Sequence, residues 1–226
     1  MSLRFRNRIE AGRTLAGHLT AYAGRNDVLV LGLPRGGVPV AAEVARRLAA
    51  PLDVFVVRKL GVPGHPEFAM GALASGGIRL VDPKVVRDLG VTDEEIERAT
   101  AVELRELARR ERTYRAGREF PELGDRIVII VDDGLATGST MQAAIAALRE
   151  KRPRKIVVAA PVAAAETCAK LGPLVDQIVC VRTPDPFLAV GLWYEDFSET
   201  TDAEIHEILA TAGSPSAAGT MQGELR

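Results

Sequence analysis

The sequence predicts an α/β fold with a mostly parallel central sheet flanked by helices. Short runs of β-branched and apolar residues alternate along the chain with segments whose apolar residues recur at helical spacing. Two of these runs, residues 28–31 and 127–131, each lead through a glycine-containing loop into a helix. The second run consists of five β-branched apolar residues, which is the composition of a strand buried on both faces of a parallel sheet.

Length, charge and composition limit the classes of function. With 226 residues the chain can bury the core of one domain, and neither an internal repeat nor an interdomain linker divides it. Its 30 acidic residues nearly balance 29 lysines and arginines, so no bulk charge favours nucleic acid or a membrane. No apolar run approaches the roughly 18 residues of a membrane span, and we expect a cytoplasmic protein. Cys168 and Cys180 lack metal-ligand spacing, and we expect reduced core thiols.

The first 90 residues are expected to alternate helices and strands around one long loop. Apolar spacing predicts helix 5–22, strand 28–31, helix 38–49, strand 53–57 and a hairpin of 69–74 with 78–81. Arg58 and Lys59 stand at the end of the second strand. Residues 60–68 follow with two glycines and two prolines, a composition that predicts an irregular loop. At a strand end, such a loop is a candidate lid over a site.

The remaining residues continue the alternation after one long helix. Thr92 and Glu95 form a capping box, and the helix it opens is expected to end near Ala116. Its arginines follow glutamates at a spacing of four, the pattern of a solvated, ion-paired face rather than a nucleic-acid surface. The later elements are expected as strand 127–131, helix 141–148, strand 155–160, helix 164–171, strand 177–181 and helix 201–210.

The chemistry-bearing residues concentrate directly after strand 127–131. Two carboxylates, Asp132 and Asp133, precede a loop of small residues that opens a helix: Gly134, Leu135, Ala136, Thr137, Gly138, Ser139 and Thr140. Backbone N–H groups and the helix dipole favour an anion there, and glycines let the backbone approach it. We expect the two acids at an exposed strand end. Their carboxylates can accept hydrogen bonds from hydroxyl groups and can lie near a hydrated Mg²⁺ ion. A phosphate, a diol and a metal together indicate a sugar phosphate.

Residues 128–140, Val-Ile-Ile-Val-Asp-Asp-Gly-Leu-Ala-Thr-Gly-Ser-Thr, resemble the phosphoribosyl-pyrophosphate signature of type I phosphoribosyltransferases. The resemblance covers about residues 25–182. It is closest to a phosphoribosyltransferase-like subgroup with a Pro-Arg-Gly-Gly loop, here 34–37, and an Arg-Lys-Leu-Gly…His-Pro-Glu loop, here 58–67. It implies a single domain over residues 1–212, followed by a tail at 213–226 that we expect to be disordered.

The resemblance assigns the sugar-phosphate end of the ligand. Asp132 and Asp133 would hold the ribose hydroxyls, directly or through the water shell of Mg²⁺, the implied cofactor. The backbone of residues 134–140, with the hydroxyls of Thr137, Ser139 and Thr140, would bind the 5′-phosphate.

The resemblance also assigns a second, pyrophosphate-binding group of residues. Arg35, Gly36 and Gly37 would bind pyrophosphate in a loop that often contains a non-proline cis peptide, here expected between Pro34 and Arg35. The catalytic candidates are Asp133 together with Arg58 and Lys59, which would meet pyrophosphate as it leaves.

Catalysis would then rest on charge stabilisation and on the exclusion of water. Displacement of pyrophosphate from an anomeric carbon passes through an oxocarbenium-like state, and Mg²⁺ with Arg35, Arg58 and Lys59 would stabilise the departing charge. Closure of the 60–68 loop would exclude water. For His65 on that loop we prefer a solvent-facing position to a role as general acid or base, and Glu67 could pair with Arg58 or Lys59.

The acceptor is less defined by the sequence than the donor. An irregular segment at 183–197 carries four of the ten aromatic residues and begins a hood-like region that extends to about residue 212. There Trp193 or Tyr194 could stack on a base, with Asp196 accepting from ring N–H groups, or the cluster could pack the sheet edge. Helix 92–117 is an insertion relative to minimal members, and whether it covers the site or mediates a homodimer stays open.

These observations lead to one preferred function and two alternatives. We expect Mg²⁺-dependent transfer of a phosphoribosyl group from phosphoribosyl pyrophosphate to a nucleobase-like nitrogen acceptor, with release of pyrophosphate. The first alternative is a regulatory protein of the same fold that senses phosphoribosyl pyrophosphate and binds nucleic acid. The second alternative is a hydrolase that uses the two aspartates. It is the least favoured, because the sequence offers neither a nucleophile nor a set of metal ligands for it.

Overall fold

The computed structural model describes residues 4–212, without the side chains of residues 66 and 67. Its centre is a sheet of five parallel strands in the order β2-β1-β6-β7-β8. The strands are β1 (Val28–Gly32), β2 (Leu52–Val54), β6 (Ile127–Val131), β7 (Lys155–Val162) and β8 (Gln177–Arg182). This confirms the predicted α/β fold with a mostly parallel central sheet.

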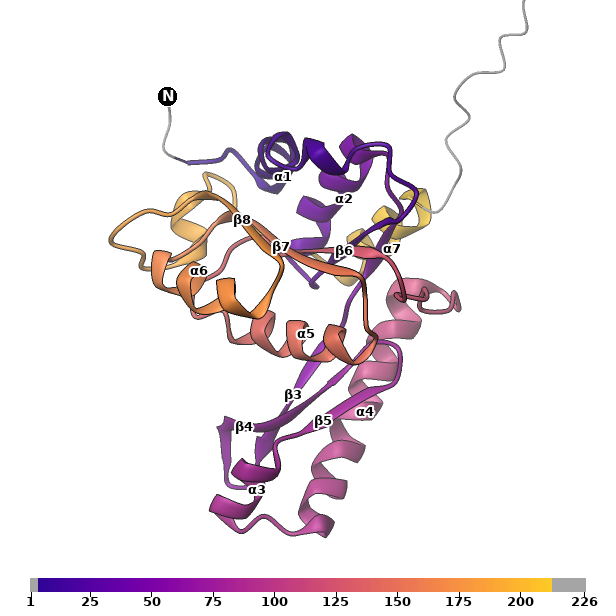
Figure 1. The fold of residues 1–226 in the computed structure, drawn as a ribbon, viewed down its shortest axis with the longest axis vertical. Helices are drawn as coiled ribbons and strands as arrows, with labels where there is room; N and C mark the ends of the chain where they lie inside the picture. The colour runs from indigo at the N-terminus through magenta and orange to yellow at the C-terminus, as the bar shows by residue number, and fades with distance from the viewer. Residues whose placement is uncertain (1–3, 213–226) are drawn as a thin grey trace, which may run out of the picture.

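Helices cover both faces of the central sheet (Figure 1). One face packs against α1 (Arg8–Gly17), α2 (Gly37–Leu48) and α7 (Asp202–Ala212), and the other against α5 (Ser139–Glu150) and α6 (Ala165–Leu171). Alternate residues of β6 divide between the two cores: Ile129 belongs to the first and Ile130 to the second. Both faces of β6 are therefore buried, as its unbroken β-branched run predicts.

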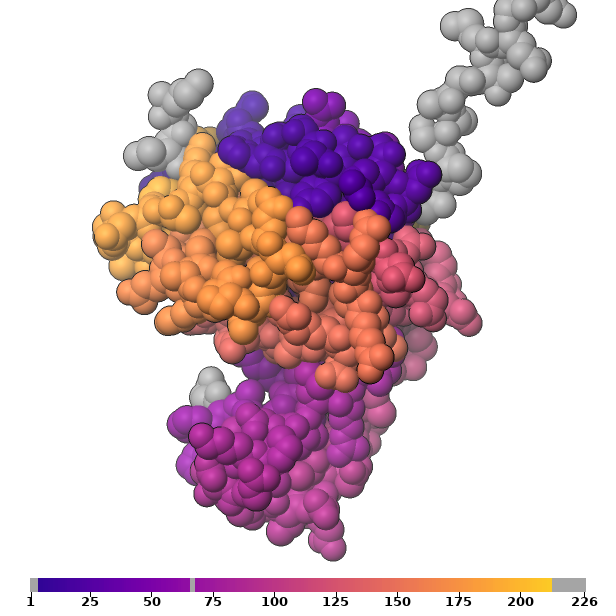
Figure 2. All heavy atoms as spheres, viewed as in Figure 1, coloured from indigo at the N-terminus to yellow at the C-terminus, as the bar shows by residue number. Residues whose placement is uncertain are grey.

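A second, antiparallel sheet projects from the central one, and we call residues 57–115 the arm. It contains β3 (Val57–Val62), β4 (His65–Ala74), β5 (Ile78–Val81), α3 (Pro83–Leu89) and α4 (Asp93–Arg115). Figure 2 shows the arm as a purple and magenta lobe that extends away from the rest of the molecule. The predicted hairpin of β4 with β5 and the long capped helix are confirmed, the latter with both hydrogen bonds of the Thr92–Glu95 capping box.

The expectation of an irregular loop at residues 60–68 is wrong. β3 and β4 form a hairpin there, in which Pro63 and Gly64 make the turn and Gly64 takes a positive φ of 77°. Gly61 lies at a shift in the β3–β4 register. Glycine and proline suggested an irregular loop here. In the hairpin, Pro63 and Gly64 lie in the turn and Gly61 lies at the bulge, and these positions tolerate such residues.

Two other predicted elements differ in their limits. The strand expected at 53–57 is divided, because β2 ends at Val54 and β3, which starts at Val57, belongs to the other sheet. The helix expected at 5–22 is shorter: the Asn7 side chain accepts from the Glu10 N–H and so begins α1 at Arg8. After α1 ends at Gly17, only a short 3-10 helix remains, at Thr20–Tyr22.

The C-terminal part of the described chain runs from β8 through an irregular segment, residues 183–201, that we call the hood segment. It contains one 3-10 turn (Val190–Trp193) and pairs with the N-terminal segment, since the Phe5 N–H donates to the Trp193 carbonyl at 2.8 Å. Cys168 and Cys180 are free thiols, as expected, with sulfurs 2.8 Å apart between α6 and β8. No helix among residues 4–212 has the length and apolar character to cross a membrane. The expected tail at 213–226 lies outside the described residues.

Candidate functional site

The loop between β6 and α5, residues 134–140, forms a small cradle at the carboxyl end of the central sheet. It lines a cavity of about 180 Å³ together with Asp132 and Val190 of the hood segment. The loop is anchored from behind: Leu135 is buried and its N–H donates to the Val162 carbonyl at 3.0 Å. The Thr167 hydroxyl on α6 donates to the Ala136 carbonyl. This anchoring fixes the loop while Thr137 and Ser139 remain at its surface, with their hydroxyl oxygens 3.3 Å apart.

Two glycines of the cradle have no room for a side chain. A Cβ on Gly134 would overlap Val190, which closes this end of the cavity. A Cβ on Gly138 would lie 2.5 Å from the Thr167 methyl group, and Gly138 also has a positive φ of 70°. Packing against Val190 and Thr167 therefore requires glycine at both positions, and the close approach of the backbone to an anion stays a prediction.

The second glycine-containing loop, residues 33–37, meets the acid pair, Asp132 and Asp133. Strands β1 and β6 are parallel neighbours, so the loops that follow them lie at the same edge of the sheet. A Cβ on Gly36 would overlap the Asp133 carboxylate, and a Cβ on Gly37 would lie 2.6 Å from the Val131 carbonyl oxygen. The peptide bond between Pro34 and Arg35 is cis, which confirms the prediction. Arg35 itself forms an ion pair with Glu199 of the hood segment.

The acid pair is more enclosed than an exposed strand end. The Asp133 side chain is only 13% exposed, which corrects that expectation, because the 33–37 loop and α1 cover it. Its Oδ2 accepts from Arg8 Nε at 2.9 Å, and its carbonyl oxygen accepts from the Tyr194 hydroxyl at 2.5 Å. Asp132 Oδ1 accepts from the Asp133 N–H at 2.9 Å.

Burial and mutual repulsion shape the ionisation of this pair. Burial raises the pKa of Asp132 well above its usual range, and the neighbouring Asp133 charge raises it further. Burial also raises the pKa of Asp133, while the adjacent Arg8 guanidinium opposes that rise. Two carboxylates that share one cation favour a further positive charge or hydroxyl donors from a ligand.

The acid pair also fits a magnesium ion that is held by few protein ligands and keeps part of its water shell. Carboxylate oxygens are the hard donors that Mg²⁺ prefers, and this ion commonly keeps several waters and ligand phosphates alongside one or two carboxylates. Within residues 4–212 as described, no group of three or more His, Cys, Asp or Glu side chains could hold a metal. Asp132 and Asp133 would supply such donors to an ion that keeps water and ligand oxygens, and the Mg²⁺ cofactor stays a prediction.

The structure separates Arg58 from Lys59. Successive residues of a strand point to opposite faces, and these two follow that rule on β3. Lys59 Nζ donates to Ser139 Oγ at 2.7 Å and so reaches the cradle. Arg58 Nε instead donates to Glu103 of α4 at 2.6 Å. His65 is exposed beside the β3–β4 turn and packs edge-on to Phe68, whereas the side chain of residue 67 is not described.

The two aromatic candidates of the hood segment also differ. Tyr194 is 3% exposed and packs between Phe5 and Phe197, with ring centroids 5.8 and 5.1 Å away. Stacking of Tyr194 on a base is therefore excluded in this structure, and it belongs to the core. Trp193 is half-buried against the same cluster, and its indole nitrogen has no hydrogen-bond partner among the described residues.

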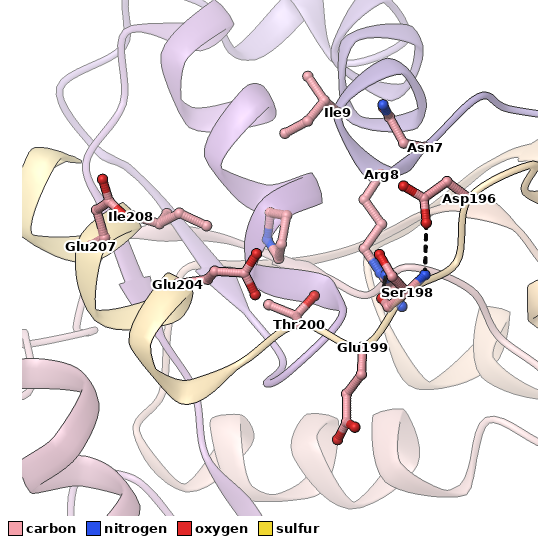
Figure 3. A pocket seen from close by; sticks show the side chains of 11 residues that line it. Asn7, Arg8, Ile9, Asp196, Ser198, Glu199, Thr200, Glu204, Glu207 and Ile208 are labelled. Atoms are coloured by element: carbon pink, nitrogen blue, oxygen red, sulfur yellow. Dashed lines mark hydrogen bonds between the residues drawn. The ribbon is translucent and has the colours of Figure 1, made fainter.

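A second cavity, of about 350 Å³, lies between α1, α2, the hood segment and α7 (Figure 3). Arg8 and Asp196 line one side, and Glu204 and Glu207 of α7 face them from the other. Asp196 accepts from the Ser198 N–H at 3.0 Å. Sequence reasoning missed both this cavity and Arg8, because no local pattern links α1 to a carboxylate 125 residues later.

Comparison with known proteins places this site in a family. A family model described as the phosphoribosyl transferase domain matches residues 3–171. Two proteins named "Putative phosphoribosyl transferase", from two strains of Mycobacterium tuberculosis, are 44% identical to this chain over 221 residues. The alignment covers 95% of this chain and 50% of each relative, so the chain spans about half the length of the curated relatives it matches.

Solved structures share the fold of this chain. The crystal structure of the protein TT1426 from Thermus thermophilus superposes with a TM-score of 0.83 at 43% identity, over 93% of this chain and 100% of that one. The protein AQ2163 from Aquifex aeolicus shares the fold at a TM-score of 0.50 and 13% identity, over 89% and 84% of the two chains. Since the family model matches more than half of the sequence and includes the cradle and the 33–37 loop, the chain belongs to the phosphoribosyl transferase domain family.

Proposed function

We propose that this chain transfers a phosphoribosyl group from phosphoribosyl pyrophosphate to a nucleobase-like nitrogen acceptor and releases pyrophosphate. One observation carries the proposal: the cradle, the acid pair and the 33–37 loop meet at the carboxyl ends of two adjacent parallel strands. This arrangement places an anion site first, then two carboxylates that can accept hydrogen bonds from hydroxyl groups, and then a second anion site. It matches a sugar with a phosphate at one end and a pyrophosphate at the other.

The cradle and the acid pair bind the ribose 5-phosphate part of the donor. N–H groups at the start of α5 and the hydroxyls of Thr137, Ser139 and Thr140 donate to the 5′-phosphate. The carboxylates of Asp132 and Asp133 accept from the ribose hydroxyls. Lys59, which already contacts Ser139, adds positive charge at the mouth of the cradle.

The chemical step breaks the bond between the anomeric carbon and pyrophosphate while the acceptor nitrogen bonds to that carbon. Positive charge develops on the sugar ring and negative charge on the departing pyrophosphate, which Arg35 and the backbone of Gly36 and Gly37 stabilise. Asp132 and Asp133 would hold Mg²⁺, in part through water, and the bound ion would add positive charge for the pyrophosphate oxygens. Val190 covers one end of the cradle and reduces the access of water.

Three of the six arginines of α4 are engaged by other groups of the protein, which favours this proposal over a nucleic-acid-binding sensor. Arg109 and Arg110 both donate to Glu106, at 2.8 and 2.7 Å. Arg115 is buried in contacts with the central sheet. Side chains engaged in this way are poorly suited to phosphate contacts along a duplex.

The test is release of pyrophosphate. The protein is incubated with phosphoribosyl pyrophosphate, Mg²⁺ and each of a panel of nucleobases, and pyrophosphate is measured over time. We expect release that depends on one acceptor and that falls at least about a hundredfold in Lys59→Gln. The matched control is Lys170→Gln, an exposed lysine on α6 whose nearest carboxylate, on Glu166, is 4.0 Å away. Tight donor binding without release for any acceptor would contradict the enzymatic proposal.

A further inference from the structure

Arg8 contacts the Asp133 carboxylate, and three groups fix the Arg8 guanidinium in place. Its Nε donates to Asp133 Oδ2 at 2.9 Å, and its Nη1 donates to the Ser198 carbonyl at 2.6 Å. The guanidinium carbon lies 4.1 Å from the centre of the Phe197 ring. Only 12% of the Arg8 side chain is exposed, and Figure 3 shows it extending from α1 toward Ser198.

Asp133 is confined on its other sides as well. The Tyr194 hydroxyl donates to the Asp133 carbonyl oxygen, and the lack of a side chain at Gly36 is what makes room for the carboxylate. The recorded contact with Arg8 uses Oδ2, so further lone pairs of the carboxylate remain to accept from a ligand. The position of this acceptor is therefore set by residues of α1, the hood segment and the 33–37 loop.

We infer that Arg8 is a positioning residue, which holds the Asp133 carboxylate in one orientation for the ribose hydroxyls. A carboxylate this enclosed needs a paired cation, and a stacked guanidinium that also donates to a carbonyl fixes its rotamer in a way that a mobile cation does not. An acceptor that is already ordered contributes more to binding, because the ligand does not bear the entropy of ordering it. The inference rests on the proposed function, since it assumes that Asp133 meets a ribose.

The inference also gives α1 a part in the site. The sequence resemblance begins near residue 25 and assigns no role to the preceding helix. Through Arg8, α1 and the hood segment are joined across the acid pair, although Arg8 and Ser198 lie 190 residues apart.

The test compares ribose 5-phosphate with its 2-deoxy and 3-deoxy analogues, by calorimetric or fluorescence titration in buffer with Mg²⁺. A hydrogen bond to a charged acceptor predicts that the wild type prefers ribose 5-phosphate to one of the analogues by about tenfold or more. In Arg8→Gln we expect that preference to fall to about threefold or less, with affinity for inorganic phosphate unchanged within about twofold. Because the preference is a ratio, a loss of folded protein affects both ligands equally and cancels.

Two further variants separate positioning from general stability. Arg8→Lys keeps the charge but lacks the planar fork of donors, so it should fold at least as well as Arg8→Gln and still lose most of the preference. Arg13→Gln is the matched control: Arg13 lies on the same helix, is exposed and pairs with Glu43 at 3.0 Å. It should keep the wild-type preference.

Each result decides a different question. If both Arg8 variants retain the wild-type preference for ribose 5-phosphate, the positioning role is overturned while the proposed function stands. If the wild type binds ribose 5-phosphate but does not distinguish it from either analogue, Asp133 does not hold a hydroxyl and the inference fails. If the wild type does not bind ribose 5-phosphate or phosphoribosyl pyrophosphate at all, the proposed function fails first.

Discussion

The central sheet and the arm contribute to the same site but are held in place by different interactions. Strands β1 and β6 are buried along their whole length, so the loops that follow them start from fixed positions. The arm is antiparallel, shares only part of the core, and leaves four large apolar side chains exposed: Phe68, Leu89, Val102 and Leu104. Lys59 of the arm donates a hydrogen bond to Ser139 of the cradle. Apolar packing therefore fixes the anion site, and the arm brings a cation to it.

One buried arginine bridges the two regions at their junction. Arg115, at the end of α4, donates to Asp53 at 3.0 Å, to the Val54 carbonyl at 2.6 Å and to Ser75 at 3.1 Å. These partners lie on β2 and on the turn between β4 and β5, so a single side chain joins the central sheet to the arm. We therefore expect substitutions at this junction to destabilise the folded protein more than substitutions on the outer surface of the arm.

The largest effect is expected from Arg115→Met. It leaves Asp53 buried without its cation, and removal of one partner of a buried pair costs about 3–5 kcal/mol. Denaturant unfolding measures this loss. The control is Arg112→Met, an exposed arginine one turn earlier on the same helix, which should change stability by less than about 0.5 kcal/mol. Equal losses in the two variants would show that the junction does not depend on the buried pair.

The two neighbours on β3 should differ in their effects on turnover. Lys59→Gln removes a charge at the cradle and should lower kcat/KM for phosphoribosyl pyrophosphate by about a hundredfold. Arg58→Gln removes a contact with Glu103 and should resemble Glu103→Gln, with a much smaller decrease than in Lys59→Gln. Steady-state release of pyrophosphate gives both values. A larger loss in Arg58→Gln than in Lys59→Gln would mean that the arm rearranges in the working enzyme and brings Arg58 to the ligand.

A smaller effect is expected from Gly138→Ala in the cradle. The left-handed backbone at this position disfavours any side chain by about 1–2 kcal/mol, and the added methyl group would press on Thr167. Stability should fall by that amount, and affinity for inorganic phosphate should weaken as the loop shifts. Gly17→Ala, where the added carbon meets nothing within 4 Å, serves as control. Unchanged phosphate affinity in Gly138→Ala would argue against a phosphate in this loop.

The smallest effect concerns the surface of α4 and its dependence on pH. Arg109, and then Arg110, lower the pKa of Glu106 from 4.5 to about 2. A carboxyl group with a lowered pKa stabilises the folded state above pH 4.5 and loses this contribution as the pH falls toward about 2. Because these side chains lie at the surface and are partly exposed, we expect Glu106→Gln to cost less than about 1 kcal/mol at pH 7. Unfolding at pH 7 and at about pH 3 measures it, and a difference that grows at low pH would contradict the assignment.

The sequence alone determined the features that depend on neighbouring residues. Strand, acid pair and cradle occupy one continuous run, 127–140, so residue type and spacing were enough to predict them. The capping box at Thr92 is local in the same way, whereas the cis bond at Pro34–Arg35 was expected from the family resemblance. The meeting of the two glycine loops was not determined in this way, because the order of the strands cannot be read from the sequence and only the structure shows β1 and β6 as neighbours.

The tertiary structure decided everything that depends on which face a side chain occupies or on distant partners. Residues 60–68 were predicted to be a loop, so the opposite orientations of Arg58 and Lys59 on β3 could not be anticipated. Tyr194 and Phe5 lie far apart in the sequence, and only their packing shows that the tyrosine is buried. The pairing of Arg8 with Asp133 spans 125 residues. No spacing rule reaches that far, because such contacts arise from how the helices and strands pack together.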